Sequence, residues 1–131
     1  AQVRATEVQL EAAHGADFNA IWRRLSEGRA ALETVVDYVA GHAKSDIKAV
    51  YAGSVPYLKL AGIVLGGWQM ARAALIARRK LDAEAGDAQF YEAKIASARF
   101  FADHILSQSA GLCIAIVEGS TGVLALSEEQ F

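Results

Sequence analysis

Two residues near the start of the chain have the types and the spacing of a metal-binding pair. Glu11 and His14 are three positions apart, which places both side chains on one face of a helix. Bundles that hold two iron ions use two such Glu-x-x-His elements and two further glutamates from facing helices. This sequence has no second Glu-x-x-His, and Gly15, a typical helix-ending residue, follows directly. A surface pair is the favoured interpretation, and we assign no metal ligand.

A second chemical possibility is a general base formed by the adjacent residues Asp103 and His104. Neighbouring residues of a helix point about 100° apart, so this pair cannot form a proton relay by itself. No nucleophile motif accompanies it, and the sequence contains no glycine-rich phosphate-binding motif. We therefore assign no catalytic and no cofactor-binding residue.

Lys94 and Arg99 are the charged residues that are hardest to explain as ordinary surface. They lie among aromatic residues in the mostly apolar segment 90–101. Long basic side chains can cover apolar surface with their stems while their heads reach carboxylates or helix ends. That structural role is the favoured interpretation. Contact with another domain, or with a phosphate-bearing ligand of that domain, stays open as the alternative.

The charge balance argues against a nucleic-acid surface, because 13 Lys and Arg face 15 Asp and Glu and the net charge is -2. The basic run 78–80 is followed by acidic residues, and such mixed signs predict a solvated helix end. The single cysteine, Cys113, cannot form an internal disulfide and is expected to pack as a small apolar residue. Nothing indicates an oxidising compartment, so we expect a cytoplasmic protein.

Neither a signal peptide nor a membrane span is expected. The N-terminus lacks an apolar stretch, and the absence of an initiator methionine is consistent with a piece of a longer chain. The most apolar long stretch, 58–77, contains Gln69 and Arg72. Because charges are costly inside spanning helices, the interior helix of a bundle is the favoured interpretation.

The elements that must position these residues are expected to be helices throughout. Apolar residues recur at steps of three and four, and there is a single proline. The pattern predicts an all-α, up-and-down antiparallel bundle with about four main helices in one domain over residues 1–131. The predicted helical ranges are 3–14, 17–41, 47–52, 54–83, 87–105 and a continuation to about 118, with a break at 119–122 and a last turn at 123–126.

Helix ends and close contacts are also predicted. Asp17, Asp46 and Asp87 are the expected N-caps, and Gly86 is the expected stop after the second long helix. Gly28 is a predicted weak point, because glycine inside a helix costs up to about 1 kcal/mol relative to alanine. The glycines Gly62, Gly66 and Gly67 are expected to admit a bulky neighbour, either Trp22 or Phe100.

Two ordered motifs resemble one family. They are Pro56–Gly62 with Gly66-Gly67-Trp68 and Ala71–Ala74, and Phe90–Phe101. Both look like the additional C-terminal domain of certain bacterial acyl-CoA dehydrogenases, in the branch of the 3-methylmercaptopropionyl-CoA and acetyl-CoA dehydrogenase-like proteins. The resemblance is good from about Ser54 onward and rests on periodicity before it. Ser107 follows Leu106 where the family pattern has a proline.

The resemblance implies a parent oxidoreductase in which a glutamate removes the α proton of an acyl-CoA and FAD accepts the β hydride. That glutamate normally lies upstream in a Tyr-Glu-Gly segment, whereas Tyr91-Glu92 here is followed by Ala93. No catalytic or flavin-binding residue is therefore carried over, and the chain by itself is not expected to be an enzyme. Such a domain is expected to pack on the catalytic domains, shape the quaternary structure of a homo-oligomer and cover part of the substrate entrance.

Two alternatives from other functional classes stay open. One is a free-standing bundle that binds a metal or small ligand, which Glu11 and His14 suggest. The other is a homo-oligomeric adaptor that uses the glycine-lined face around Gly62 and Gly66.

Overall fold

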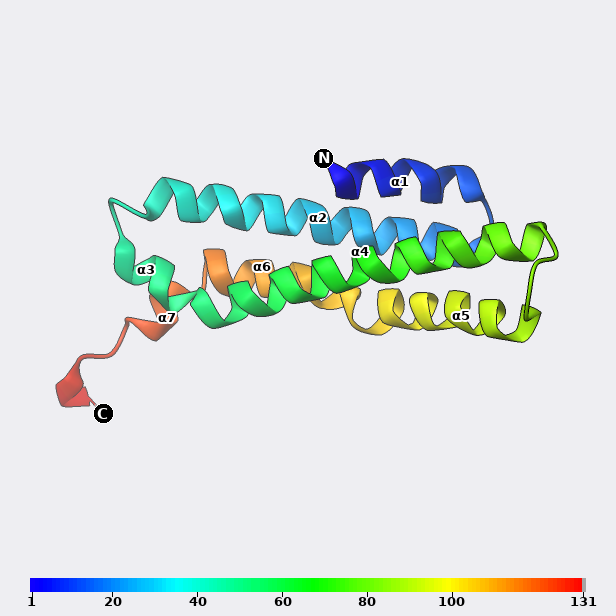
Figure 1. Ribbon diagram of the computed structural model, residues 1–131. Helices are drawn as coiled ribbons and strands as arrows, with labels where there is room; N and C mark the ends of the chain where they lie inside the picture. Colours follow the sequence, from blue (N-terminus) through cyan, green and yellow to red (C-terminus); the bar gives the residue numbers. More distant parts are fainter. Residues whose placement is uncertain (131) are drawn as a thin grey trace.

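Apolar residues at three- and four-residue steps form long helices that pack side by side (Figure 1). The computed structural model describes residues 1–130, and in that part of the chain every regular element is helical. The all-α bundle predicted from the sequence is thus confirmed. The helices are α1 (Gln2–Ala13), α2 (Ala16–His42), α3 (Ile47–Ala52), α4 (Ser54–Asp82), α5 (Ala88–His104), α6 (Ser109–Val117) and α7 (Ser120–Val123), with 3-10 turns at Leu106–Gln108 and Glu128–Gln130.

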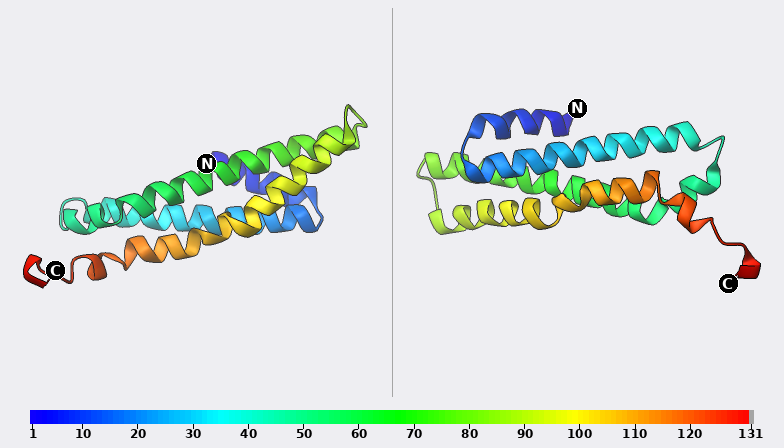
Figure 2. Two further views of the ribbon diagram at one scale, coloured as in Figure 1. Left: turned by 90° about the horizontal axis from the view of Figure 1, so that it is seen from below. Right: turned by 180° about the vertical axis from the view of Figure 1, so that it is seen from behind.

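The long helices form an antiparallel bundle. α2 and α4 run in opposite directions, and α5 and α6 lie end to end as one bent rod that contacts both of them (Figures 1 and 2). α1 doubles back along α2 and also contacts α4, so it covers only one end of the pair. The short helix α3 contacts α2, α4 and α7 at the opposite end of the bundle.

Most helix ends lie where the sequence predicts them, with one wrong cap. The Asp46 carboxylate accepts a hydrogen bond from the backbone N–H of Ala49 at 3.1 Å. Asp87 likewise accepts from Gln89 at 3.0 Å. Asp17 is not a cap: α2 begins at Ala16 after Gly15, whose φ of 103° turns the chain sharply out of α1. The Asp17 carboxylate instead accepts a hydrogen bond from Arg99.

The last predicted break is also partly wrong. The residues expected to interrupt the chain form the helical turn α7, because the N–H of Val123 bonds the carbonyl of Gly119 and that of Leu124 bonds Ser120. The interruption is therefore limited to the two residues after α6. The last turn, predicted at 123–126, forms at Ser120–Val123, three residues earlier.

At the loop after α4 the predicted stop at Gly86 is wrong. α4 ends at Asp82, and Glu84, with a φ of 51°, takes the left-handed conformation that closes the helix end, where the N–H of Ala85 bonds the carbonyl of Lys80. Gly86, with a φ of 82°, lies in the loop that follows.

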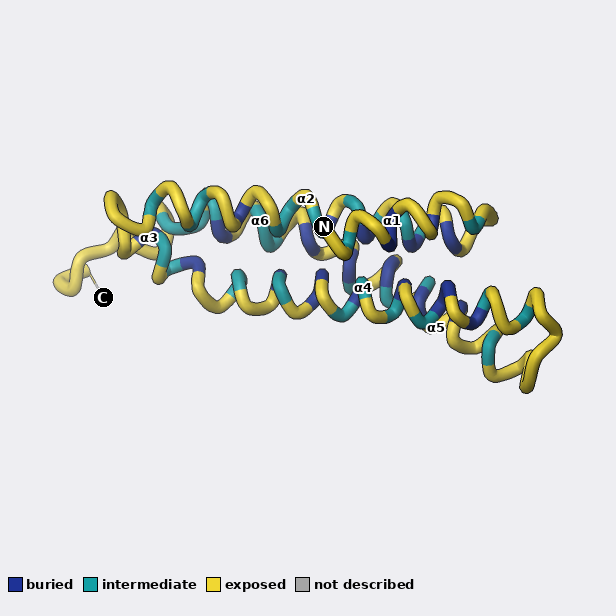
Figure 3. The backbone as a smooth tube through the Cα atoms, turned by 45° about the horizontal axis from the view of Figure 1, so that its top comes forward, coloured by how far each residue is buried: buried dark blue, intermediate teal, exposed yellow. Residues whose placement is uncertain are grey.

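The buried residues form two clusters along the rod (Figure 3). The larger cluster has members in α1, the first half of α2, α4 from Ile63 onward, and α5, and it includes Phe18, Leu25 and Ile95. The smaller cluster lies toward the α3 end and consists of Val35, Leu60, Val64 and Ile116. Leu106, at the bend between α5 and α6, belongs to the larger cluster and lies near the junction of the two.

Glycines in α2 and α4 make room for that bend. A Cβ added at Gly67 would lie 2.6 Å from the Leu106 side chain, and one added at Gly28 would lie 3.3 Å from it. Gly66 faces Phe101, and Gly62 has nothing within 4 Å. The neighbours predicted from the sequence, Trp22 and Phe100, are therefore wrong. Gly28 is buried at a close contact, so its cost to the helix is offset by packing.

The bend forms without the proline of the family pattern. Carbonyl groups that the bend frees accept hydrogen bonds from side chains: Ser107 Oγ donates to the carbonyl of Asp103 at 2.7 Å, and Gln108 Nε2 donates to that of His104 at 3.0 Å. Ser109 Oγ donates to the carbonyl of Leu106 at 2.7 Å. These bonds satisfy the broken turn of helix.

Two helical stretches are long and apolar enough to cross a membrane by length and composition alone, α4 and the run Ala88–Val117. The most apolar window of α4 is 44% buried against its neighbours. Core helices of soluble bundles pass the same test, and Arg72 lies within the apolar stretch. The length of these helices therefore gives only weak support for a span.

Candidate functional site

Glu11 and His14 are both exposed at the end of α1. His14 follows the last residue of the helix and has a φ of 56°, so it does not continue the helical face that carries Glu11. Within residues 1–130, no group of three or more His, Cys, Asp or Glu side chains lies close enough to hold a metal ion. Because the chain turns at His14, the three-residue spacing does not place the Glu11 and His14 side chains on one helical face.

Asp103 and His104 have separate partners. The Asp103 carboxylate accepts a hydrogen bond from Arg99 Nε at 2.8 Å. The His104 ring packs against Phe100 with the ring centroids 4.5 Å apart. Both residues are exposed, and their different orientations leave no proton relay between them.

Arg99 and Lys94 have the contacts that a structural role predicts. Arg99 Nη1 also reaches Asp17 at 3.1 Å, so this guanidinium links α5 to the start of α2. The hydrogen bond with Asp103 raises the pKa of Arg99, and the charge is therefore permanent. Lys94 Nζ lies 5.1 Å from the centre of the Phe90 ring.

A partly buried ion network that the sequence analysis missed joins α1 to α2. Arg29 Nε donates to Glu7 at 2.6 Å, and its Nη1 donates to Glu33 at 2.9 Å. Arg4 donates to the other oxygen of Glu33 at 2.9 Å. The Glu7 side chain is only 9% exposed, and its hydrogen bond raises the pKa of Arg29. The Arg29–Glu33 spacing of four was visible in the sequence, whereas Glu7 and Arg29 are 22 positions apart and form no local pattern.

A second long-range bond fixes α1 to α4. Trp68 Nε1 donates to the Thr6 hydroxyl at 2.8 Å, and that hydroxyl donates to the carbonyl of Gln2 at 3.3 Å. Thr6 is buried although it is polar. The bond therefore satisfies two polar groups that packing removes from water. Both long-range contacts hold α1 against its neighbours.

Cys113 is a free thiol that packs beside the smaller cluster. Burial raises its pKa, and the nearby Glu118 carboxylate raises it further. Because the thiolate is the reactive form, the side chain is suited to packing, as predicted, and not to nucleophilic attack.

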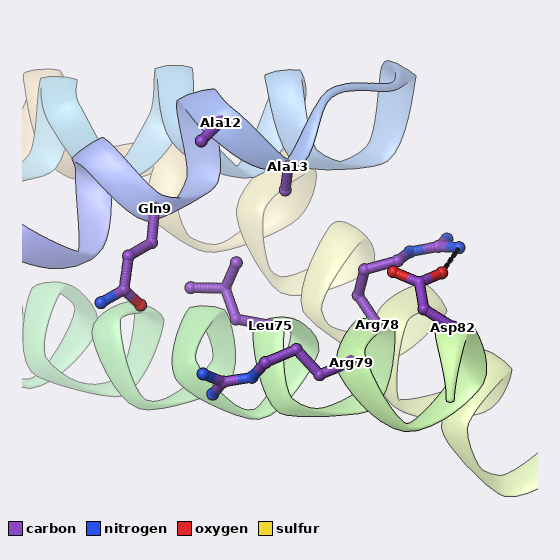
Figure 4. A pocket seen from close by; sticks show the side chains of 7 residues that line it. All are labelled: Gln9, Ala12, Ala13, Leu75, Arg78, Arg79 and Asp82. Carbon is purple, nitrogen blue, oxygen red and sulfur yellow. Dashed lines mark ion pairs between the residues drawn. The ribbon is translucent and has the colours of Figure 1, made fainter. Parts of the chain in front are cut away.

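The basic run after the middle of α4 borders a shallow groove against α1 (Figure 4). The groove encloses about 370 Å³. In it Arg78 pairs with Asp82 at 3.7 Å, while Arg79 extends toward Leu75 and Gln9 (Figure 4). Arginine stays protonated in proteins, so Arg78 and Arg79 supply permanent positive charge to this groove.

Two further grooves are mainly apolar. One continues the line of α1 between α2 and α4 and encloses about 380 Å³; it is lined by Val3, Arg29, Leu32, Glu33, Val36, Asp37, Val64 and Leu65. The other, also about 380 Å³, lies at the α3 end and has no charged residue in its lining, which includes Val39, Tyr57 and Ile116. Such surfaces suit packing against another protein element.

Comparison with known proteins assigns this helical bundle to a family. The family model described as "Acetyl-CoA dehydrogenase C-terminal like" matches residues 1–127, and the chain belongs to this family. The match includes α1 and α2, for which the sequence analysis had only periodicity.

A particular relative supports the same branch. The chain is 43% identical over 104 residues to the 3-methylmercaptopropionyl-CoA dehydrogenase of Ruegeria pomeroyi. The alignment covers 79% of this chain and 17% of that protein. The chain thus spans less than a fifth of the length of this relative, and the resemblance stated from the two motifs is confirmed.

Proposed function

We propose that the chain is the C-terminal structural domain of a longer FAD-dependent acyl-CoA dehydrogenase of bacterial, cytoplasmic origin. The observation that supports this most strongly is the family match over nearly the whole chain, combined with a relative of which it covers only 17%. In this proposal all 131 residues act as one domain that packs on the catalytic domains and helps to shape the quaternary structure. The α,β-dehydrogenation of the acyl-CoA thioester belongs to the parent enzyme.

The described residues do not fit a flavin. The grooves enclose about 200 to 380 Å³ and are open to solvent, whereas cofactor sites bury most of their ligand in a deeper cavity. The chain also lacks a glycine-rich loop after a strand, the element that binds the diphosphate of dinucleotides. We therefore derive no chemical step through FAD in this domain, and the flavin and the acyl-CoA are proposed to bind elsewhere in the parent.

The apolar groove at the α3 end suits the proposed contact with the catalytic domains. Tyr51 is 68% exposed beside it. Burial of apolar area is the main driving force for packing of domains, so an exposed surface of this kind is expected to be covered in the parent. The same contact would let the domain border the substrate entrance.

The proposal is tested by purifying the 131-residue chain and recording its absorbance spectrum and its activity with acyl-CoA and an electron acceptor. We expect a colourless, folded helical protein without dehydrogenase activity. A yellow preparation with stoichiometric flavin would contradict the proposal. Metal analysis of the same sample tests the alternative of a metal-binding bundle, which stoichiometric iron, manganese or zinc would support.

A further inference from the structure

One side of α4 carries a regular stripe of exposed residues. Toward the end of the helix three of them, Arg72, Ile76 and Arg79, border the groove against α1. The residues of the stripe, which we call the outer face, are all exposed and alternate in steps of three and four: Val55, Leu58, Gly62, Leu65, Gln69, Arg72, Ile76 and Arg79. Leu58 is 70% exposed, Leu65 50% and Ile76 47%. This is the seven-residue spacing with which two helices pack along their length. An apolar stripe of this kind is unusual on the outside of a bundle.

The outer face is complementary to the same face of a second copy that runs antiparallel to it. If a second α4 lies antiparallel with Gly67 of each copy at the centre, Leu58 faces Ile76 of the other copy. In the same register Leu65 faces Gln69. Arg72 faces Gly62, beside which nothing lies within 4 Å in the single chain. Apolar side chains therefore meet each other, and the long arginine meets the residue that leaves the most room. We propose that the outer face of α4 binds the same face of a second copy in this register.

The positions of charged residues support a second copy as the partner of the outer face. α4 has no acidic residue from Ser54 to Leu81, so an α4 pair by itself would bring only positive charges together. Asp37 of α2 lines the groove beside Leu65. In the described part of the chain neither Asp37 nor Arg72 takes part in an ion pair. The two-fold rotation places Arg72 of each copy opposite Gly62 of the other, on the side of α4 that borders this groove. We therefore expect the Arg72 guanidinium to reach the Asp37 carboxylate of the other copy.

In the same two-fold arrangement, the second copy would cover the groove between α2 and α4 that α1 leaves open. α1 contacts α4 between Trp68 and Arg79, and reversal about Gly67 places this stretch opposite residues 55–66 of the other copy. That region borders the groove with Val36, which is 46% exposed. Val8, on the outward side of α1, is 67% exposed. Each α1 would thus extend the interface by packing over the uncovered half of the other copy.

The pairing is tested by sedimentation equilibrium of the 131-residue chain over a wide concentration range. We expect a dimer, and Leu58→Lys is expected to raise its dissociation constant at least about tenfold, because the substitution occurs twice in a symmetric interface. Ile114→Lys changes a residue that is 58% exposed on α6 and should leave dimerisation unchanged. Circular dichroism checks that each variant folds. A chain that stays monomeric, or a dimer that Leu58→Lys does not weaken, would overturn the proposal.

Two further experiments test the register. Asp37→Arg and Arg72→Asp should each weaken the dimer, and the double variant should recover at least part of the affinity. In a Cys113→Ser background, Leu58→Cys together with Ile76→Cys should form disulfide-linked dimers on oxidation. These two positions are about 27 Å apart on one helix, so they cannot bridge within a chain, and each single variant should remain uncrosslinked. Failure of the pair to crosslink contradicts this register. None of these outcomes depends on flavin or activity, so they are independent of the proposed function.

Discussion

Single residues explain why the two halves of the bundle meet as closely as they do. Leu106 lies at the bend between α5 and α6. Its side chain occupies the space that Gly28 and Gly67, which have no side chains, leave on the facing helices. Arg29 has a comparable part on the other side of α2, because it neutralises the nearly buried Glu7. In both cases one side chain joins elements that are distant in the sequence.

At this scale we predict that Gly67→Ala destabilises the protein although it improves helix propensity. The added methyl group would lie 2.6 to 2.8 Å from three Leu106 atoms. Overpacking costs about 1–3 kcal/mol, and the helical gain of up to about 1 kcal/mol offsets only part of it. A net loss of roughly 1–2 kcal/mol in the free energy of unfolding is expected by urea denaturation.

Gly111→Ala is the matched control for that change. Gly111 is also helical, but nothing lies within 4 Å of an added Cβ. This variant should gain up to about 1 kcal/mol of stability. Equal stability changes in the two variants would show that the contact with Leu106 is unimportant.

At the scale of elements, the bend after α5 is set by packing and side-chain hydrogen bonds and does not depend on proline. Ser107 lies in the 3-10 turn, and its hydroxyl bonds the carbonyl of Asp103. The turn ends α5 at His104 and lets α6 start at Ser109 with a new direction. α6 can therefore contact the first half of α4 while α5 contacts the second.

We predict that Ser107→Pro, which restores the family pattern, changes the stability by no more than about 1 kcal/mol. Proline fixes φ near the value of a 3-10 turn and reduces the entropy of the unfolded chain, which offsets the loss of the hydroxyl bond. Ser97→Pro, in the middle of α5, should instead cost about 3 kcal/mol or more. Thermal unfolding of both variants compares them, and a severe loss in Ser107→Pro would show that this turn is incompatible with proline.

At the scale of the whole molecule, stability is unevenly distributed along the rod. The larger cluster has 13 buried residues and the smaller one has 4. Because local opening is easiest where few apolar contacts are lost, the α3 end is expected to open more readily. This is also the end that exposes Tyr51, Val55 and Leu58.

Hydrogen exchange followed by mass spectrometry should therefore show faster exchange in α6 and the second half of α2 than in α5 and the first half of α2. The comparison is made at a concentration where the chain is monomeric, so that self-association does not protect α4. Uniform protection along the rod would contradict the two-cluster description. If exchange at the smaller cluster slows as the concentration rises, that change locates the contact between copies.

The sequence by itself determined the helices, most of their ends and the family. Helix periodicity and the Asp46 and Asp87 caps depend on residues within a few positions of each other, so a local pattern is enough to predict them. The motifs at 56–74 and 90–101 gave the family resemblance in the same way.

Only the tertiary structure decided which side chains meet between helices. The angle and register at which two helices cross are set by the packing of the whole bundle, and no local spacing reports them. For this reason the Leu106–Gly67 contact, the Glu7–Arg29 pair and the Asp17–Arg99 link were all missed. The same reason applies to α4, which is apolar on two sides. Its sequence predicts a buried stripe, but the bundle covers one apolar face and leaves the other, through Leu58, Leu65 and Ile76, exposed.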